Sequence, residues 1–377
     1  MVHLRSEQVF VDLAEFRGQL KVPACSRLSQ HLGLTAAFLV MSAHQIHTTY
    51  RQSVQSKFST LHAVDRLEDV DTCFIWVDTT RCGADRTIGR LVWPLERGTV
   101  SIPITPSSAS DVEPRFIHLD REALGRAIAK VGALLRMSAT TGRNRGRLRR
   151  EESRTKFRQL ESLFLEERSW TLSEFNDRLT SLLLDQIGLR PRGVFLSSLL
   201  AQGMLTDSVN HFLNNLDTCI RVFNRAISRL EQAGLDPQVK PVEPDYLPLH
   251  VACARDYRRL KLRRQTRGKD HFAVAGCKCG QAYAFYLGSN TLSIATLLET
   301  NRWSPDVSLL IFLNQLVSGH LAGKSSALYG LVLNAVMRDG LGIEPVPVLV
   351  PDQLGDDGPP SPFIDCLLYR YFFGLPQ

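Results

Sequence analysis

Two short apolar runs decide the fold: AAFLVMS at residues 36–42 and CFIWVD at residues 73–78. Each is a continuous run of strand length, which is typical of a strand buried on both faces of a parallel sheet. The residues between them include a predicted helix over 52–64. The order strand, helix, strand indicates a β-α-β unit, in which the two strands run parallel.

A third run of this kind, PVPVLV at 345–350, follows a helical-looking stretch from Val307 to Met337. We therefore predict an α/β fold, with a Rossmann-like parallel-sheet core assembled from both ends of the chain, interrupted by a helical insertion and a small zinc-ribbon-like module. The predicted domains are the first part of the core (1–120), the helical insertion (121–236), the Cys-containing β module (237–290) and the second part of the core (291–377).

Two patterns make the insertion helical. The sequence TLSE at 171–174 is a capping box, flanked by Trp170 and Phe175 as a hydrophobic staple, and its helix should end near Gly188. Between 207 and 233 the apolar residues recur at steps of 3 and 4, which predicts one long amphipathic helix. Its apolar stripe either packs on neighbouring helices of the insertion or forms a homodimer.

Composition excludes several classes of protein. The chain has 377 residues, of which 44% are hydrophobic and 22% charged, so it can bury a sizeable core in two or three domains. Its longest near-apolar stretch, 32–43, is too short to cross a membrane, and residues 1–12 do not resemble a secretory leader. Six of the eight cysteines are scattered singly, which favours a reduced, cytoplasmic protein without a membrane partner.

Positive charge is concentrated in two places. Residues 143–158 carry a net charge of +6 and residues 255–269 carry +7. Since the whole chain carries +7, the remaining residues have a net charge of −6. We interpret 143–158 as a linker. The run 255–269 has one aromatic residue, and either contacts nucleic-acid phosphates or forms a solvated hairpin.

The β module contains a candidate zinc site. His250 and Cys253 are followed, after 23 intervening residues, by Cys277 and Cys279 with glycines on either side. Imidazole and thiolate ligands on two turns suit a tetrahedral structural zinc, which would hold together a module too small for its own core. The alternative is a set of unliganded thiols.

Polar residues follow the two opening strands. His44 and His47 come directly after the first strand, and Asp78 ends the second. Ligands of parallel α/β sheets bind at this edge, so the histidines are candidates to hold a phosphate and Asp78 to hold an amino group. The alternatives are solvated loop histidines and an aspartate that only caps the next segment.

Two further segments near the C-terminus attract attention. In RWSPDV at 302–307, Ser304 and Pro305 predict a helix start with Asp306 in its first turn. Gly323, Lys324 and Ser325 resemble the end of a phosphate-binding loop, but Ser318 stands where that motif needs its first glycine, so we reject a Walker loop. Lys324 is still a candidate to meet an anion.

The order of these features resembles the bacillithiol synthase family. The residues that carry the resemblance are Gln45 in the turn after a strand, Lys57 in the next helix, FIWVD at 74–78, LEQAGLDPQV at 230–239 and RWSPDV at 302–307. The resemblance implies a Rossmann-like core and the addition of cysteine to the amine of a sugar-malate conjugate. It places Gln45, Lys57, Trp303, Ser304, Asp306 and Gly323 in an active cleft, in a distant relative with a shortened C-terminus.

We therefore expect a C–N bond-forming ligase or synthase that couples an amino acid, such as cysteine, to an acceptor amine or carboxylate. His44 and His47 would hold a phosphate of ATP, of another nucleotide or of a phosphorylated intermediate, while Lys324 would meet developing negative charge. Gly323 and Ser325 would complete that loop. The alternative is a nucleic-acid-binding protein, with a zinc ribbon and a basic hairpin on an inactive nucleotide-binding core.

Overall fold

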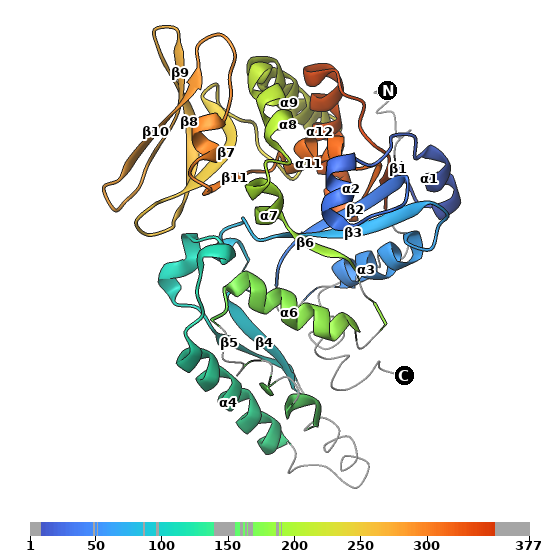
Figure 1. Cartoon of the computed structure of the whole chain (residues 1–377), viewed down its shortest axis with the longest axis vertical. Coiled ribbons are helices and arrows are strands. Elements are labelled where there is room, and N and C mark those ends of the chain that lie inside the picture. The colour runs from blue at the N-terminus through green and yellow to red at the C-terminus, as the bar shows by residue number, and fades with distance from the viewer. Residues whose placement is uncertain are drawn as a thin grey trace. The chain divides into compact units, whose positions relative to one another are not determined.

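Figure 1 shows the protein as a computed structural model. It describes residues 9–350 except for 48–49, 51, 86, 96–97, 139–154, 159–160, 163, 165–168, 186–187 and 190. The predicted linker at 143–158 therefore lies almost entirely outside the described residues, as does the segment after Val350.

A six-stranded, all-parallel sheet forms the centre of the fold, with strand order β1-β13-β12-β2-β3-β6. Its strands are β1 (Val9–Phe10), β2 (Phe38–Gln45), β3 (Val70–Val77), β6 (Gly193–Phe195), β12 (Gly319–Leu321) and β13 (Val348–Leu349). The sheet thus takes strands from both ends of the chain, which confirms the prediction of a parallel α/β core.

The β-α-β unit forms as predicted. Helix α3 spans Gln52–Val64, and the middle residues of β2 and β3 are buried, as expected of strands covered on both faces. One prediction of its boundaries was wrong, because β2 continues through His44 and Gln45 instead of ending at Ser42.

The prediction of continuous helix from Val307 to Met337 was also wrong. The chain forms α11 (Leu309–Leu313), strand β12, α12 (Lys324–Ala335) and one π-helical turn (Val336–Gly340). Serine side chains join β12 to its neighbour β2: Ser318 Oγ accepts from Leu39 N at 3.0 Å, and Ser42 Oγ donates to Leu321 O at 2.9 Å. This strand is specified by its partners rather than by an apolar run of its own.

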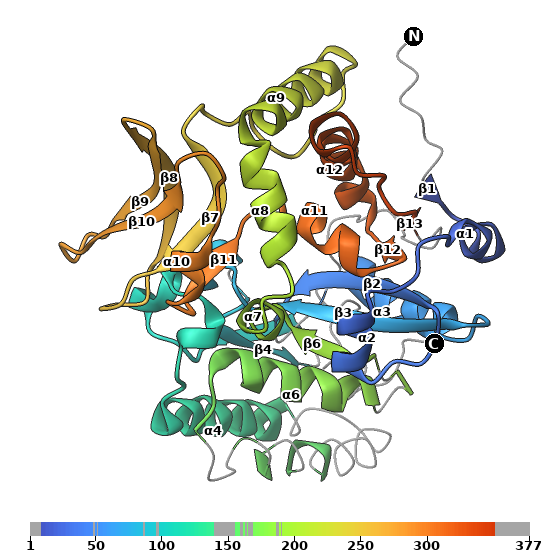
Figure 2. The ribbon, with the colours of Figure 1, turned by 45° about the horizontal axis from the view of Figure 1, so that its top comes forward.

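The long amphipathic segment is two helices, α8 (Thr206–Asn214) and α9 (Leu216–Gln232) (Figure 2). The break falls at two asparagines whose amides donate to the preceding helical turn, Asn214 Nδ2 to Asn210 O and Asn215 Nδ2 to His211 O. The predicted stripe is buried within this single chain, at Val209, Phe212, Leu216, Ile220, Phe223, Ile227 and Leu230. This agrees with a stripe that packs within the chain, and the homodimer stays a prediction.

The capping box is present in both directions at helix α6 (Leu172–Asp185). Glu174 N donates to Thr171 Oγ1 at 3.2 Å, and Thr171 N donates to Glu174 Oε2 at 3.0 Å. Two amides at the start of the helix are thereby satisfied. Gly188, where the helix was predicted to end, has φ +73°, a conformation that favours glycine.

We expect Thr171→Ala to lower the free energy of unfolding by about 1 kcal/mol, because it removes the capping hydroxyl. Thr171→Ser keeps that hydroxyl and should remain close to the wild type. Denaturant titration of the three proteins measures the difference, and an equal loss in the serine variant would show that the threonine methyl group, not the cap, is responsible.

A second, five-stranded antiparallel sheet has the order β10-β9-β8-β7-β11 (Figure 1). Its strands are β7 (Tyr246–Ala252), β8 (Arg259–Arg267), β9 (Asp270–Gly276), β10 (Ala282–Gly288) and β11 (Trp303–Pro305). The small β module predicted at 237–290 is thus a sheet that also recruits a strand from RWSPDV. The predicted helix start at Ser304 was wrong, because Ser304 pairs with His250 across two strands.

The described part of the chain contains further helices, a hairpin and short turns of helix. They are α1 (Leu13–Gln19), α2 (Ser26–Leu32), α4 (Arg121–Ser138), α7 (Leu196–Ala201), α10 (Ala295–Leu298), the hairpin of β4 (Arg90–Leu95) with β5 (Gly98–Pro103), and 3-10 turns at Cys82–Ala84, Ser107–Asp111, Pro114–Phe116 and Asn314–Leu316. Within the described part of the chain, no helix is both long enough and apolar enough to cross a membrane.

The chain folds into two compact units. Unit 1 comprises the residues up to Ala43, Thr60–Ile75 and the described residues from Pro191 onward, and it contains most of the parallel sheet and all of the antiparallel one. Unit 2 contains His44–Ser59 and Trp76–Arg190, and therefore the last residues of β2 and β3. The predicted domain boundaries at 120, 236 and 290 stay a prediction, and the compact units are divided at other positions.

Candidate functional site

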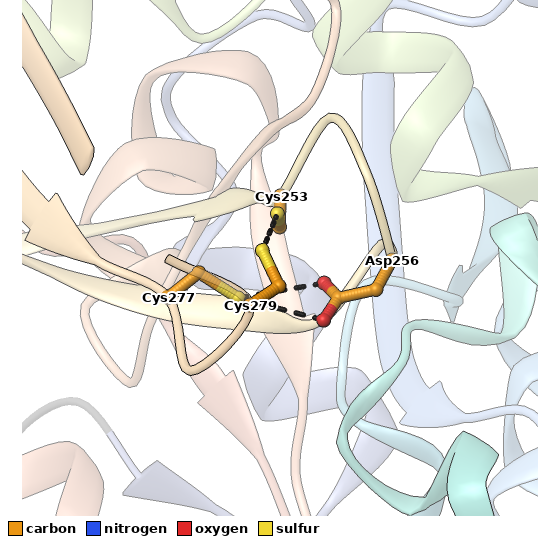
Figure 3. A group of neighbouring side chains, drawn as sticks. All are labelled: Cys253, Asp256, Cys277 and Cys279. Atoms are coloured by element: carbon orange, nitrogen blue, oxygen red, sulfur yellow. Dashed lines mark hydrogen bonds between the residues drawn. The ribbon is translucent and has the colours of Figure 1, made fainter. Parts of the chain in front are cut away.

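Four side chains of unit 1 converge where two turns of the antiparallel sheet meet (Figure 3). Cys253 and Asp256 belong to the turn between β7 and β8, and Cys277 and Cys279 to the turn between β9 and β10. Their ligand atoms all lie within 4.8 Å of one another. We call this group the cysteine cluster; it has the size and donor chemistry to hold a metal ion.

Hydrogen bonds already join the members of the cluster. The sulfurs of Cys253 and Cys279 are 3.5 Å apart, and Cys277 Sγ lies 3.5 Å from both carboxylate oxygens of Asp256. Outside the cluster, Tyr283 Oη donates to Cys253 Sγ at 3.1 Å. Such bonds from neighbouring groups orient metal-binding thiolates.

Three of the four predicted zinc ligands are therefore brought together, and the fourth is not. His250 lies within strand β7, three residues before Cys253, and successive side chains of a strand alternate between its two faces. It is opposite Lys261 and Ser304, and burial, together with Arg259 and Lys261, lowers the pKa of its imidazole well below the usual range. Asp256 takes the place predicted for His250.

A second group of titratable side chains lies in unit 2, at the carboxyl end of β2. His44 is the last residue but one of that strand, His47 follows the strand, and Lys57 lies on α3. The two imidazole rings are 5.3 Å apart between centroids. We call these three residues the histidine–lysine cluster. The structure thus brings His44, His47 and Lys57 into one environment.

Burial changes the charge of this cluster. It lowers the pKa of His44 to about 3, with further lowering by the positive charges of Lys57 and His47, and it lowers the pKa of Lys57 to about 8. His44 is therefore neutral at neutral pH, and the predicted binding of a phosphate by the two histidines stays a prediction. A buried lysine with a pKa near 8 is partly neutral under the same conditions, which suits a proton acceptor.

The hydrogen bonds of the two histidines assign their tautomers. His44 Nδ1 is 2.8 Å from Gln45 O, and a carbonyl only accepts, so Nδ1 carries the proton. Thr87 Oγ1 donates to Asp85 Oδ1 at 2.8 Å, so it must accept from His47 Nδ1 at 2.7 Å. In the neutral form, each ring then has its lone pair on Nε2.

Gln45 lies between the two histidines in sequence, and Asp78 belongs to the same unit. Gln45 is the last residue of β2, and Asp78 follows β3 directly with 1% of its surface exposed. Thr87 and Asp85, which fix the tautomer of His47, were not predicted. Thr87 lies 40 residues after His47 in the sequence, and no local pattern predicts the contact between them.

The remaining predicted site residues belong to unit 1. Asp306 Oδ2 accepts from Tyr246 Oη at 2.8 Å and from Lys261 Nζ at 2.7 Å, so this carboxylate is an ion-pair centre at the end of β11. Trp303 and Ser304 are buried in β11. Gly323 is the N-cap of α12 and Lys324 its first residue; the side chains of Lys324 and Ser325 are outside the described set.

The chain matches no family model and no curated protein sequence. The two clusters are therefore interpreted from their own geometry and chemistry.

Proposed function

We propose that this protein is an enzyme that forms a C–N bond, coupling an amino acid to an acceptor amine or carboxylate. The observation that supports it is the histidine–lysine cluster: two imidazoles whose Nδ1 protons are hydrogen-bonded, of which burial keeps His44 neutral, beside a buried lysine of lowered pKa. Lone pairs on nitrogen accept hydrogen bonds from an amino group, and the attack of an amine needs a base that removes its proton.

In this proposal, His44 and His47 bind the amino group of the substrate and Lys57 accepts the proton that the amine loses. Thr87 and Asp85 keep the proton of His47 on Nδ1, so that Nε2 accepts. Asp78, which belongs to the same unit, shares the binding of that amino group, the part assigned to it from the sequence. The resemblance to bacillithiol synthase supports the same class of reaction, with cysteine as one candidate amino acid.

We also propose that the cysteine cluster holds a structural zinc ion. Cys253, Cys277, Cys279 and Asp256 supply four donors, and zinc prefers sulfur, nitrogen and oxygen ligands in tetrahedral sets of this number. Because the ligands come from two turns, the ion would fasten one end of the antiparallel sheet.

The basic run does not favour the nucleic-acid alternative. Four of its side chains form ion pairs within the protein: Arg258 with Asp256, Lys261 with Asp306, Arg263 with Asp245, and Arg264 with Asp217. Arg259 donates to Pro305 O at 2.8 Å. A phosphate backbone would have to compete with these internal partners, so we do not propose this function.

A thermal-shift screen against the twenty amino acids, nucleotides and short oligonucleotides tests the proposed enzyme. A ligand present at 100 times its dissociation constant adds about 2.7 kcal/mol to stability. We expect a shift with one or a few amino acids that a nucleotide increases. The shift should be lost in a variant with both His44→Gln and His47→Gln, because an amide nitrogen has no lone pair that can accept from the amine.

His62, an exposed residue of the same helix as Lys57, provides the matched control, and His62→Gln should respond like the wild type. Two results would contradict the proposal: the absence of a shift with every amino acid, or an amino-acid shift that the double variant retains. A shift with oligonucleotides alone, lost at high salt, would favour the zinc-ribbon alternative instead.

A further inference from the structure

We propose that the zinc of the cysteine cluster is a binding site for a small thiol, which enters by displacing Asp256. This inference rests on the zinc proposed above and adds a function to it. Three thiolates and one carboxylate are unequal ligands, because zinc is borderline-soft and a thiolate suits it better than a hard carboxylate oxygen does. The oxygen ligand is the one that an incoming thiol can replace.

The four side chains of the cluster also differ in how far they are exposed to solvent. Cys253 is fully buried and Cys277 nearly so, whereas 28% of the Asp256 side chain is exposed to solvent. The carboxylate and the half-buried sulfur of Cys279 therefore form the side of the cluster that a solute can reach. The buried sulfurs of Cys253 and Cys277 form the side that stays fixed.

Neighbouring groups hold Cys253 in place. Tyr283 Oη donates to its sulfur at 3.1 Å and Arg255 N at 3.4 Å. A thiolate that accepts two such bonds is oriented and partly neutralised, so it remains a ligand while another position exchanges.

Asp256, in contrast, has partners that would stabilise it after release from the metal. Its Oδ2 lies 3.4 Å from Arg258 Nε, and its Oδ1 accepts from Arg258 N at 3.2 Å. The departing carboxylate would keep both, and so would not be left as an unpaired charge. This lowers the free energy needed to open the fourth coordination position.

The exchange balances without any oxidant or reductant. A Zn–O bond to Asp256 breaks and a Zn–S bond to the thiol sulfur forms, while the thiol proton passes to solvent. The metal lowers the pKa of the thiol on binding, so the bound ligand is a thiolate near neutral pH.

Cobalt(II) in place of zinc makes the exchange visible, since each Co–S bond adds charge-transfer absorbance. Titrating the cobalt-loaded full chain with 2-mercaptoethanol should raise this absorbance by about one third, from three to four thiolates, and the rise should saturate. The thioether 2-(methylthio)ethanol, which cannot become a thiolate, should cause no rise. Metal content measured after each titration should remain at its starting value.

Two variants separate the displaceable ligand from the rest. Asp256→Cys should begin at the four-thiolate absorbance and not respond, whereas Asp256→Ala should bind the thiol at lower concentration than the wild type. A wild-type absorbance that thiol leaves unchanged, or an unaltered response in Asp256→Cys, would overturn the inference. A chain that takes up neither zinc nor cobalt would contradict the zinc proposal itself, which is a distinct result.

Discussion

Cys277→Ser is expected to leave the protein without bound zinc and to destabilise unit 1. Where free zinc is about 1,000 times the dissociation constant, bound metal contributes about 4 kcal/mol to the free energy of unfolding, and the variant should lose this amount. Serine cannot replace the thiolate, because its hydroxyl stays protonated and binds zinc weakly. Metal analysis and denaturant titration with and without zinc measure the two effects.

Two controls define the ligand set. Cys25→Ser removes a partly exposed cysteine of unit 1 that lies outside the cluster, and should keep full zinc content. His250→Ala should also keep zinc, because the strand places His250 apart from the cluster. If His250→Ala lost zinc while Asp256→Ala kept its full affinity, the ligand set assigned here would be wrong.

After the zinc is removed, we expect local unfolding to begin at one end of the antiparallel sheet. The ligands lie only in the turns Cys253–Arg258 and Cys277–Gln281, whereas Leu249 and Leu262 are fully buried nearer the middle of their strands. Apolar packing and ladder hydrogen bonds remain there without metal. Hydrogen exchange after chelation should therefore accelerate first in these two turns.

Local signals in the sequence were sufficient for part of the fold. The opening β-α-β unit rests on continuous apolar runs, and helix α3 spans the predicted residues Gln52–Val64. The capping box at Thr171 and Glu174 forms because both of its partners are within one turn of the chain. The apolar runs and the capping box depend on residues that are neighbours in the sequence, so a local sequence pattern is enough to predict them.

The short strands could not be predicted in the same way. β11 and β12 each have three residues, too few for an alternating or continuous apolar pattern. They are strands because β7 lies beside one and β2 and β13 beside the other. The helix signal of Ser304 and Pro305 was overridden by this pairing, since tertiary contacts outweigh a local preference of about 1 kcal/mol.

In the candidate sites, too, some contacts could be predicted from the local sequence and others depend on the fold. The pair Cys277 and Cys279 was recognisable, because both ligands lie in one glycine-flanked turn. Asp256 could have been considered as well, since it follows Cys253 by three residues within one turn, a spacing that allows both side chains to face one ion. The contact of His47 with Thr87 crosses 40 residues and depends on the fold, so no local pattern predicts it.

Lys57→Met is expected to stabilise the protein at pH 7 and to reduce its turnover. The side chain is 6% exposed, and burial lowers the pKa of its amine from 10.5 to about 8, so a charged Lys57 costs on the order of 3 kcal/mol. Methionine has a similar length and no charge. If Lys57 is the base of the proposed reaction, turnover of the amino acid found by the ligand screen should fall by about 10²–10⁴-fold.

The pH dependence has a definite sign. Below about pH 8, Lys57 is protonated in both the folded and the unfolded state, so the full cost is present. Between pH 8 and 10.5 the folded state has lost this proton and the unfolded state still binds it, so stability rises with pH. The advantage of Lys57→Met should therefore shrink over this range and vanish above it, while wild-type kcat/KM should rise through about pH 8.

Lys130, an exposed lysine of α4 in the same unit, is the matched control. Lys130→Met should change neither the stability at pH 7 nor the activity appreciably, because an exposed amine loses no hydration on folding. A Lys57→Met protein that is more stable and less active would show that the buried charge is kept at the expense of stability, as reactive groups of enzymes are. If Lys57→Met is less stable than the wild type at pH 7, Lys57 contributes to the packing of the fold instead. If Lys57→Met keeps the wild-type activity, Lys57 is not the base of the reaction.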